Sequence, residues 1–159
     1  MNSIGAIIVA CFAVFWVAAG AHVLGRRWFL MLLTMSIAIS GAIVFAAMSL
    51  PFGRQSGGFN GRIYGVFVTL EVVAILIAVV LLKRIGAKQF LVPVIAFIVG
   101  AHFFGMVPAL HSNEFWWVGG AMCLLPIATI LILPQSTWAP VVGIGCAVIL
   151  WSSALSAFF

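Results

Sequence analysis

Six apolar runs of similar length fill this chain, and short polar breaks separate them. Each run is close to the roughly 20 residues that a helix needs to cross the hydrocarbon core of a bilayer. The runs lie at about residues 4 to 24, 28 to 50, 63 to 83, 89 to 110, 116 to 133 and 138 to 158. The pattern predicts an all-α, polytopic membrane protein in which residues 1 to 159 form a single transmembrane domain of six transmembrane helices.

Most breaks are too short to pass over a neighbouring helix, so each joined pair of helices is expected to form an antiparallel hairpin. Pro134 and Pro140 flank the last break, and two separate spans are favoured there over one kinked, re-entrant region. Residues 51 to 62 contain four glycines and show no helical or strand periodicity. They predict a mobile external loop, which is either a lid or a passive linker.

Composition fits this class, because 66% of the residues are hydrophobic and 6% are charged. Two breaks on the same side of the predicted bundle hold five cations: Arg26, Arg27, Lys83, Arg84 and Lys88. Short cytoplasmic loops retain Lys and Arg, so this side is predicted to be cytoplasmic and both termini to lie outside. The net charge of +5 then reflects topology and contact with anionic lipid. Basic residues interleaved with aromatic ones, which indicate nucleic-acid binding, are absent from the sequence.

Several chemistries have no sequence support. The three cysteines, Cys11, Cys123 and Cys146, lie within apolar runs and lack CxxC or His-Cys spacing, so they predict packing residues and neither a disulfide framework nor a metal site. The chain contains no Asp and no GxSxG, HExxH, Walker or GxGxxG motif. No cofactor is expected, and the sequence leaves open whether the protein is an enzyme.

Glu71 is one of only two acidic residues, and it lies inside the third apolar run. An ionisable side chain at membrane depth costs roughly 2.5 to 3.5 kcal/mol, so it marks a functional site by default. His102, in the fourth run, lies at a matching depth, because each residue is eight positions from the outer end of its helix. At the rise of an α-helix this depth is about 12 Å. The two side chains are therefore predicted to be neighbours whose protonation states are coupled.

Small residues support this contact. Ala74 and Ala78 share the face of Glu71, and Gly105 and Ala109 share the face of His102, so the two helices can approach closely. A pair of this kind serves either as a proton relay or ligand site, or only as a device that fixes helix register. On this reasoning, Glu71→Leu leaves a buried imidazole without a partner.

Three further residues lie at a comparable outer-half depth: Ser40 in the second run, and Trp151 and Ser152 in the sixth. With Glu71 and His102 they could line one polar cavity. The sequence does not decide whether the second and sixth helices face that cavity.

An internal echo relates the two halves of the chain: residues 20 to 25 read GAHVLG, and residues 100 to 105 read GAHFFG. It is either a coincidence or the trace of a three-plus-three inverted repeat, as found in many secondary transporters. Residues 99 to 104 and 143 to 154 resemble segments of small uncharacterised bacterial multi-pass inner-membrane proteins. That resemblance implies a bacterial inner-membrane location and no particular activity.

Three functions remain. The first is a small transporter or channel-like protein with an outer-half polar site on Glu71 and His102. The second is an intramembrane enzyme or a lipid- or quinone-binding protein that uses the same pair for acid/base work. The third is a non-catalytic subunit or scaffold of a membrane complex. Expected partners are the lipid bilayer, a small-molecule or ionic ligand and further copies of the chain in a homo-oligomer, with no nucleic acid.

Overall fold

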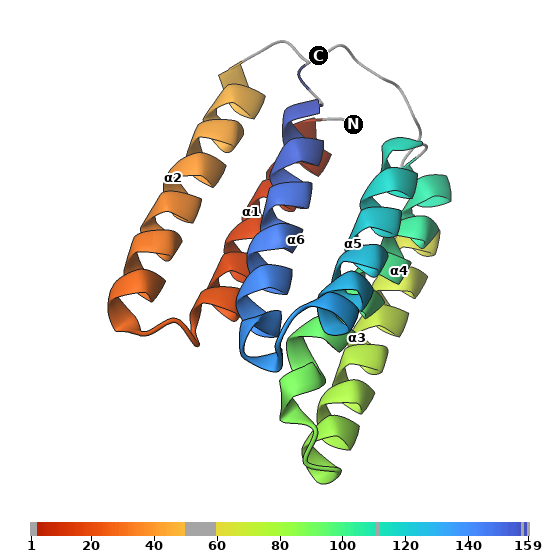
Figure 1. The fold of residues 1–159 in the computed structure, drawn as a ribbon. Helices are drawn as coiled ribbons and strands as arrows, with labels where there is room; N and C mark the ends of the chain where they lie inside the picture. The colour runs from red at the N-terminus through yellow and green to blue at the C-terminus, as the bar shows by residue number, and fades with distance from the viewer. Residues whose placement is uncertain (1–2, 50–59, 111, 157, 159) are drawn as a thin grey trace. The chain divides into compact units, whose positions relative to one another are not determined.

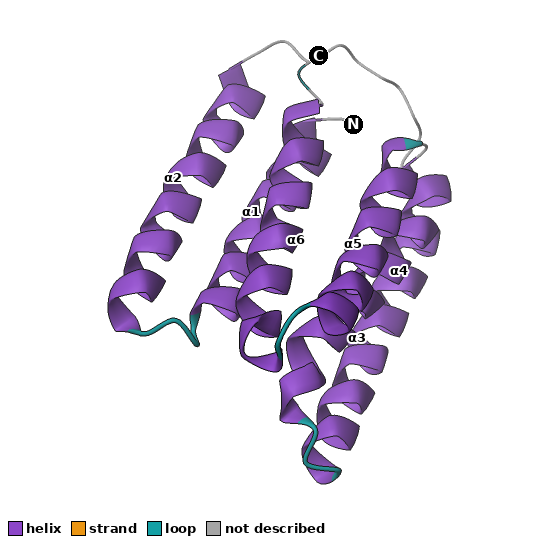
Figure 2. Ribbon diagram, in the orientation of Figure 1, coloured by secondary structure: helices purple, strands orange, loops and turns teal. Residues whose placement is uncertain are grey.

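The computed structural model describes the chain except for residues 1–2, 50–59, 111, 157 and 159, drawn in grey in Figure 1. All regular structure in the described part is helical (Figure 2), which confirms the all-α class. The α-helices are α1 (Ser3–Ala21), α2 (Arg26–Ser49), α3 (Gly61–Arg84), α4 (Leu91–Leu110), α5 (Glu114–Ile132) and α6 (Trp138–Ser156). Two short 3₁₀ helices, η1 (Lys88–Phe90) and η2 (Gln135–Thr137), precede α4 and α6.

Within the described residues, five helical segments are long and apolar enough to cross a membrane. They are Arg26–Ser49, Gly61–Arg84, Lys88–Ala109, Glu114–Ile132 and Gln135–Ser156, and Gly5–Ala21 is a shorter apolar helix. These lengths and compositions are compatible with a multi-pass protein whose helices contact the lipid bilayer. The sixth span, within α1, stays a prediction.

The helix ends follow from turn and capping residues. Gly25 (φ 88°) and Gly86 (φ 75°) adopt left-handed backbone conformations in the turns after α1 and α3. Glycine adopts such conformations without the penalty that a Cβ atom brings. At the start of α3, the side-chain oxygen of Asn60 accepts a hydrogen bond from the Ile63 N–H at 3.2 Å. Asn60 therefore caps α3, because it satisfies one of the free N–H groups of the first turn.

The chain divides into two compact units. Unit 1 comprises Met1–Ser56 and Ala139–Phe159, and so contains α1, α2 and nearly all of α6. Unit 2 comprises Gly57–Trp138 and contains α3, α4 and α5. Each unit thus combines two consecutive helices from one half of the chain with the third helix of the other half.

In unit 1, α1 packs against both α2 and α6. The contact with α6 is very close at Gly20, where an added Cβ would lie 2.9 Å from the Ala139 oxygen and 2.9 Å from the Gly143 Cα. The two helix backbones therefore touch. Small residues at such crossings let membrane helices gain van der Waals contact along their main chains.

In unit 2, α4 packs against α3 and α5. A Cβ added at Gly100 would lie 2.9 Å from the backbone nitrogen of Cys123, so α4 and α5 are also in backbone contact. The N–H of Asn60 donates to the Ala109 carbonyl at 3.0 Å, which joins the start of α3 to the end of α4. Helix α4 is thus the central helix of unit 2, and it holds α3 at a fixed level.

The first glycines of the two echoed tracts have similar surroundings, and the second glycines do not. Gly20 and Gly100 each lie against the backbone of another helix. Gly25 is in a turn, whereas Gly105 is within α4. The shared element of the two tracts is therefore the close helix contact at the first glycine.

Candidate functional site

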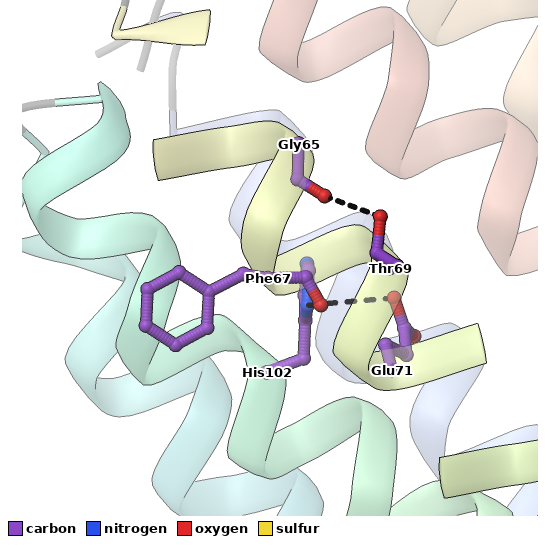
Figure 3. Close-up of polar contacts among 5 residues, drawn as sticks. All are labelled: Gly65, Phe67, Thr69, Glu71 and His102. Atoms are coloured by element: carbon purple, nitrogen blue, oxygen red, sulfur yellow. Dashed lines mark hydrogen bonds and ion pairs between the residues drawn. The ribbon is translucent and has the colours of Figure 1, made fainter. Parts of the chain in front are cut away.

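Glu71 of α3 and His102 of α4 lie side by side in unit 2 (Figure 3). The Nδ1 atom of His102 is 3.4 Å from the Oε2 atom of Glu71. The side chain of His102 is 9% exposed and that of Glu71 is 15% exposed. The two ionisable groups are therefore direct neighbours, as their equal depth predicts, and each is largely withdrawn from the surface.

The backbone carbonyl of Phe67 is a third member of this contact. Its oxygen lies 3.2 Å from the Nδ1 atom of His102. Phe67 precedes Glu71 by four residues, about one helical turn, so its carbonyl and the Glu71 carboxyl converge on the same imidazole nitrogen. Sequence reasoning missed this group, because every residue carries a carbonyl. The available signal was its position one turn before Glu71.

Gly105 allows α3 to approach α4 at this level. A Cβ atom added at Gly105 would overlap the Phe67 ring. Gly105 is three residues after His102, so both lie on the face of α4 that meets α3. The prediction that a small residue permits the approach is confirmed at Gly105.

Other polar groups near the pair are used locally. Thr69 is exposed, and its hydroxyl donates to the Gly65 carbonyl at 2.8 Å within α3 (Figure 3). Such a bond to the preceding turn is the usual way for a threonine to satisfy its hydroxyl inside a helix. Across the described residues, no group of three or more His, Cys, Asp or Glu side chains is arranged to hold a metal ion.

Ser40 and Trp151 form a second polar contact, in unit 1. The indole Nε1 of Trp151 donates to the Ser40 Oγ at 2.9 Å, and that Oγ donates to the Ala10 carbonyl at 2.8 Å. This chain of hydrogen bonds joins α6, α2 and α1. Ser40 and Trp151 belong to a different unit from Glu71 and His102, and the single cavity proposed for all of them stays a prediction.

Ser152 is exposed and has no part in this hydrogen-bond chain, whereas its neighbour Ser153 is fully buried. The Ser153 Oγ has no hydrogen-bond partner within the described part of the chain. Ser153 follows Cys146 and Leu150 at spacings of seven and three residues, and all three are buried. This helical spacing could have distinguished the inward serine from the outward one.

The histidine of the first echoed tract and the predicted external loop lie outside these polar contacts. His22 is exposed just after α1, and its Nδ1 lies 2.6 Å from the Ala19 carbonyl three residues earlier. The predicted external loop lies almost wholly outside the described residues, because its described part begins at Asn60.

In comparisons with protein-family models, with curated proteins and with solved structures, nothing matches this chain. The resemblance of residues 99 to 104 and 143 to 154 to small bacterial membrane proteins therefore stays an expectation. What the site can do follows from its own atoms. A carboxyl and an imidazole in contact can each take up and release a proton, and they can bind a polar ligand through the atoms that do not face each other.

Proposed function

We propose that this chain is a small multi-pass transporter or channel-like protein whose outer-half polar site is the Glu71–His102 pair. In this proposal six helices span a bacterial inner membrane as antiparallel hairpins, and protons are the species handled by the pair. The observation that carries it is the 3.4 Å contact between two ionisable side chains in the middle of apolar helices. Such residues inside membrane segments commonly mark ion pathways and proton relays.

The free-energy cost of placing two ionisable side chains within apolar helices supports a functional role over one that only fixes the register of the helices. Polar groups without charge, such as serine or asparagine, join helices more cheaply than an ionisable pair does. Unit 1 shows that this chain uses the cheaper solution elsewhere, because Ser40, Trp151 and the Ala10 carbonyl connect three helices without any ionisable group.

The make-up of the two units also supports transport. Helices α1 and α2 group with α6, and helices α4 and α5 group with α3. If α4–α6 repeat α1–α3, each unit contains the first two helices of one repeat and the third helix of the other. Inverted repeats are common in secondary transporters, which place their sites on repeat-related helices near the bilayer midplane.

Proton flux in liposomes tests the proposal. The purified protein in liposomes that contain a pH-sensitive dye should acidify or alkalinise the lumen when a membrane potential is imposed. Glu71→Gln should reduce this flux to the level of protein-free liposomes, because it removes the titratable carboxyl and keeps a polar side chain of similar shape. Glu114→Gln, which changes the net charge equally at the start of α5, should retain the flux.

The outcomes separate transport from the two other functions that the sequence leaves open. Flux that survives Glu71→Gln would place the pathway elsewhere in the protein. A folded wild-type protein with no flux would favour a scaffold, or an enzyme or lipid- or quinone-binding role for the same pair.

The orientation is tested by cysteine labelling of intact cells. In a variant without Cys11, Cys123 and Cys146, a cysteine at residue 60 should react with a membrane-impermeant maleimide, whereas one at residue 87 should react only after the cells are opened. The reason is the excess of cations around residue 87, which is retained in the cytoplasm. The reverse labelling pattern would invert the topology and place both termini in the cytoplasm.

A further inference from the structure

The contacts of the Nδ1 atom of His102 indicate which of the two ring nitrogens carries the hydrogen. That nitrogen lies 3.2 Å from the Phe67 carbonyl oxygen and 3.4 Å from the Glu71 Oε2. A carbonyl oxygen can only accept a hydrogen bond. The contact with the Phe67 carbonyl is therefore favourable only when Nδ1 carries a hydrogen. This condition applies to the neutral imidazole and to the charged one.

We infer that His102 takes up and releases its proton at Nε2, with the Phe67 carbonyl as the group that holds Nδ1 protonated and Glu71 as the counter-charge. This inference rests on the proposed function for its role in transport and deepens it. A direct hop of a proton from Glu71 Oε2 to Nδ1 is blocked, because Nδ1 already holds a hydrogen. The pair therefore takes up protons at two separate places, the Glu71 carboxyl and the Nε2 atom of His102, and does not pass a proton directly from one residue to the other.

The loading step balances without any other reactant. A hydronium ion gives its proton to the lone pair of Nε2, so that an N–H bond forms, an O–H bond breaks and one water is released. With Glu71 ionised, the pair passes from one net negative charge to none. Release is the same step in reverse, with water as the acceptor.

Few other titratable side chains lie on the helices that carry this pair or pack against it. On α3, the remaining titratable side chains are Tyr64 and Arg62 near the start and Lys83 and Arg84 in the last turn. On α5 they are Glu114 in the first turn and Cys123, whose Sγ lies 3.6 Å from the Phe97 carbonyl. Among the described residues, Glu71 is the charged group that lies in contact with His102.

Phe67 and Gly105 act as positioning residues in this arrangement. The Phe67 ring occupies the space that a side chain at residue 105 would need. A larger residue there must displace the Phe67 ring, and where the ring cannot rotate aside, α3 moves away from α4 and takes the Phe67 carbonyl with it. The glycine therefore leaves room for α3 to lie where its carbonyl reaches Nδ1.

Nitrogen NMR of the full-length protein, labelled with ¹⁵N-histidine in nanodiscs, tests the inference directly. The chain has three histidines, and the His102→Gln spectrum identifies the signals of His102. In the neutral form we expect a protonated Nδ1 and an unprotonated Nε2, with Nε2 as the nitrogen whose shift changes most on acidification. An unprotonated Nδ1 in the neutral form would overturn the inference.

Two variants identify the group that keeps the Nδ1 atom of His102 protonated. Glu71→Leu removes the carboxyl but leaves the Phe67 carbonyl, so the protonated Nδ1 should persist; a switch to protonated Nε2 would assign the role to Glu71 instead. Gly105→Ala should shift the population toward protonated Nε2. Gly120→Ala is the matched control, because an added Cβ at Gly120 meets nothing within 4 Å. An unchanged tautomer in Gly105→Ala would overturn the positioning role of Gly105.

These measurements separate the inference from the proposed function. The expected tautomer without any proton flux would leave the inference intact and reject transport. Flux that depends on Glu71 together with the opposite tautomer would retain transport and reject Nε2 as the loading atom.

Discussion

His102→Leu is expected to destabilise the protein more than Glu71→Leu, although each change removes one member of the same pair. The reason is an asymmetry in their partners. Without Glu71, the imidazole of His102 keeps the Phe67 carbonyl at 3.2 Å. Without His102, the Glu71 carboxyl, whose side chain is only 15% exposed, loses the contact that the structure shows for it. The expectation from sequence that Glu71→Leu strands a buried imidazole is therefore revised.

The expected loss for His102→Leu is about 1 to 3 kcal/mol, the usual cost of a buried polar group left without a partner. Glu71→Leu should cost clearly less. Removing both residues should restore part of the stability lost in His102→Leu, because the unsatisfied carboxyl is then gone as well.

Reversible unfolding of the three variants in mixed micelles of mild detergent and SDS measures these differences. His102→Gln is a useful control, since its amide can still donate to Glu71. Equal losses for the two leucine variants, with simple additivity in the double variant, would show that the pair contributes no specific interaction.

Gly143→Ala is expected to cause a large loss of stability in unit 1. An added Cβ at Gly143 would lie 2.7 Å from the Gly20 nitrogen and 2.7 Å from the Trp16 oxygen, both of which are backbone atoms of α1. Backbone cannot rotate aside as a side chain can, so α1 and α6 must separate. Overpacking of this kind typically lowers the free energy of unfolding by about 1 to 3 kcal/mol, and the loss for Gly143→Leu should exceed the loss for Gly143→Ala.

Gly41→Ala is the matched control in the same unit. Gly41 is exposed on α2, and an added Cβ there meets nothing within 4 Å. This change should be neutral or stabilising by up to about 1 kcal/mol, because alanine favours a helix more than glycine does. Thermal unfolding of both variants in detergent compares them. A Gly143→Ala variant as stable as Gly41→Ala would contradict the close contact of α1 with α6.

The sequence by itself determined the helices and the main pair. An apolar run of spanning length must form a helix in lipid. The bilayer core holds no water to hydrogen-bond the backbone, and a helix pairs its N–H and C=O groups within the run. Gly25 and Gly86 mark two of the helix ends, and the predicted limits agree with the observed ones at residues 110 and 138 and differ by one to three residues elsewhere. The regular rise of a helix then placed Glu71 and His102 at one level, because depth depends only on counting residues from the helix ends.

Only the tertiary structure decided which helices group together and which atoms complete the site. Helix α6 packs against α1 at Gly143 and Gly20, which are far apart in the chain, and Trp151 joins it to Ser40 of α2. These helices are apolar on all sides, so hydrophobic periodicity does not indicate the face that packs, as it does in a soluble protein. The Phe67 carbonyl lies within reach of His102 at the level where Gly105 leaves room for the Phe67 ring. Every residue carries a carbonyl, so the sequence marks the Phe67 carbonyl only by its place one turn before Glu71, and its contact with His102 arises when the two helices meet.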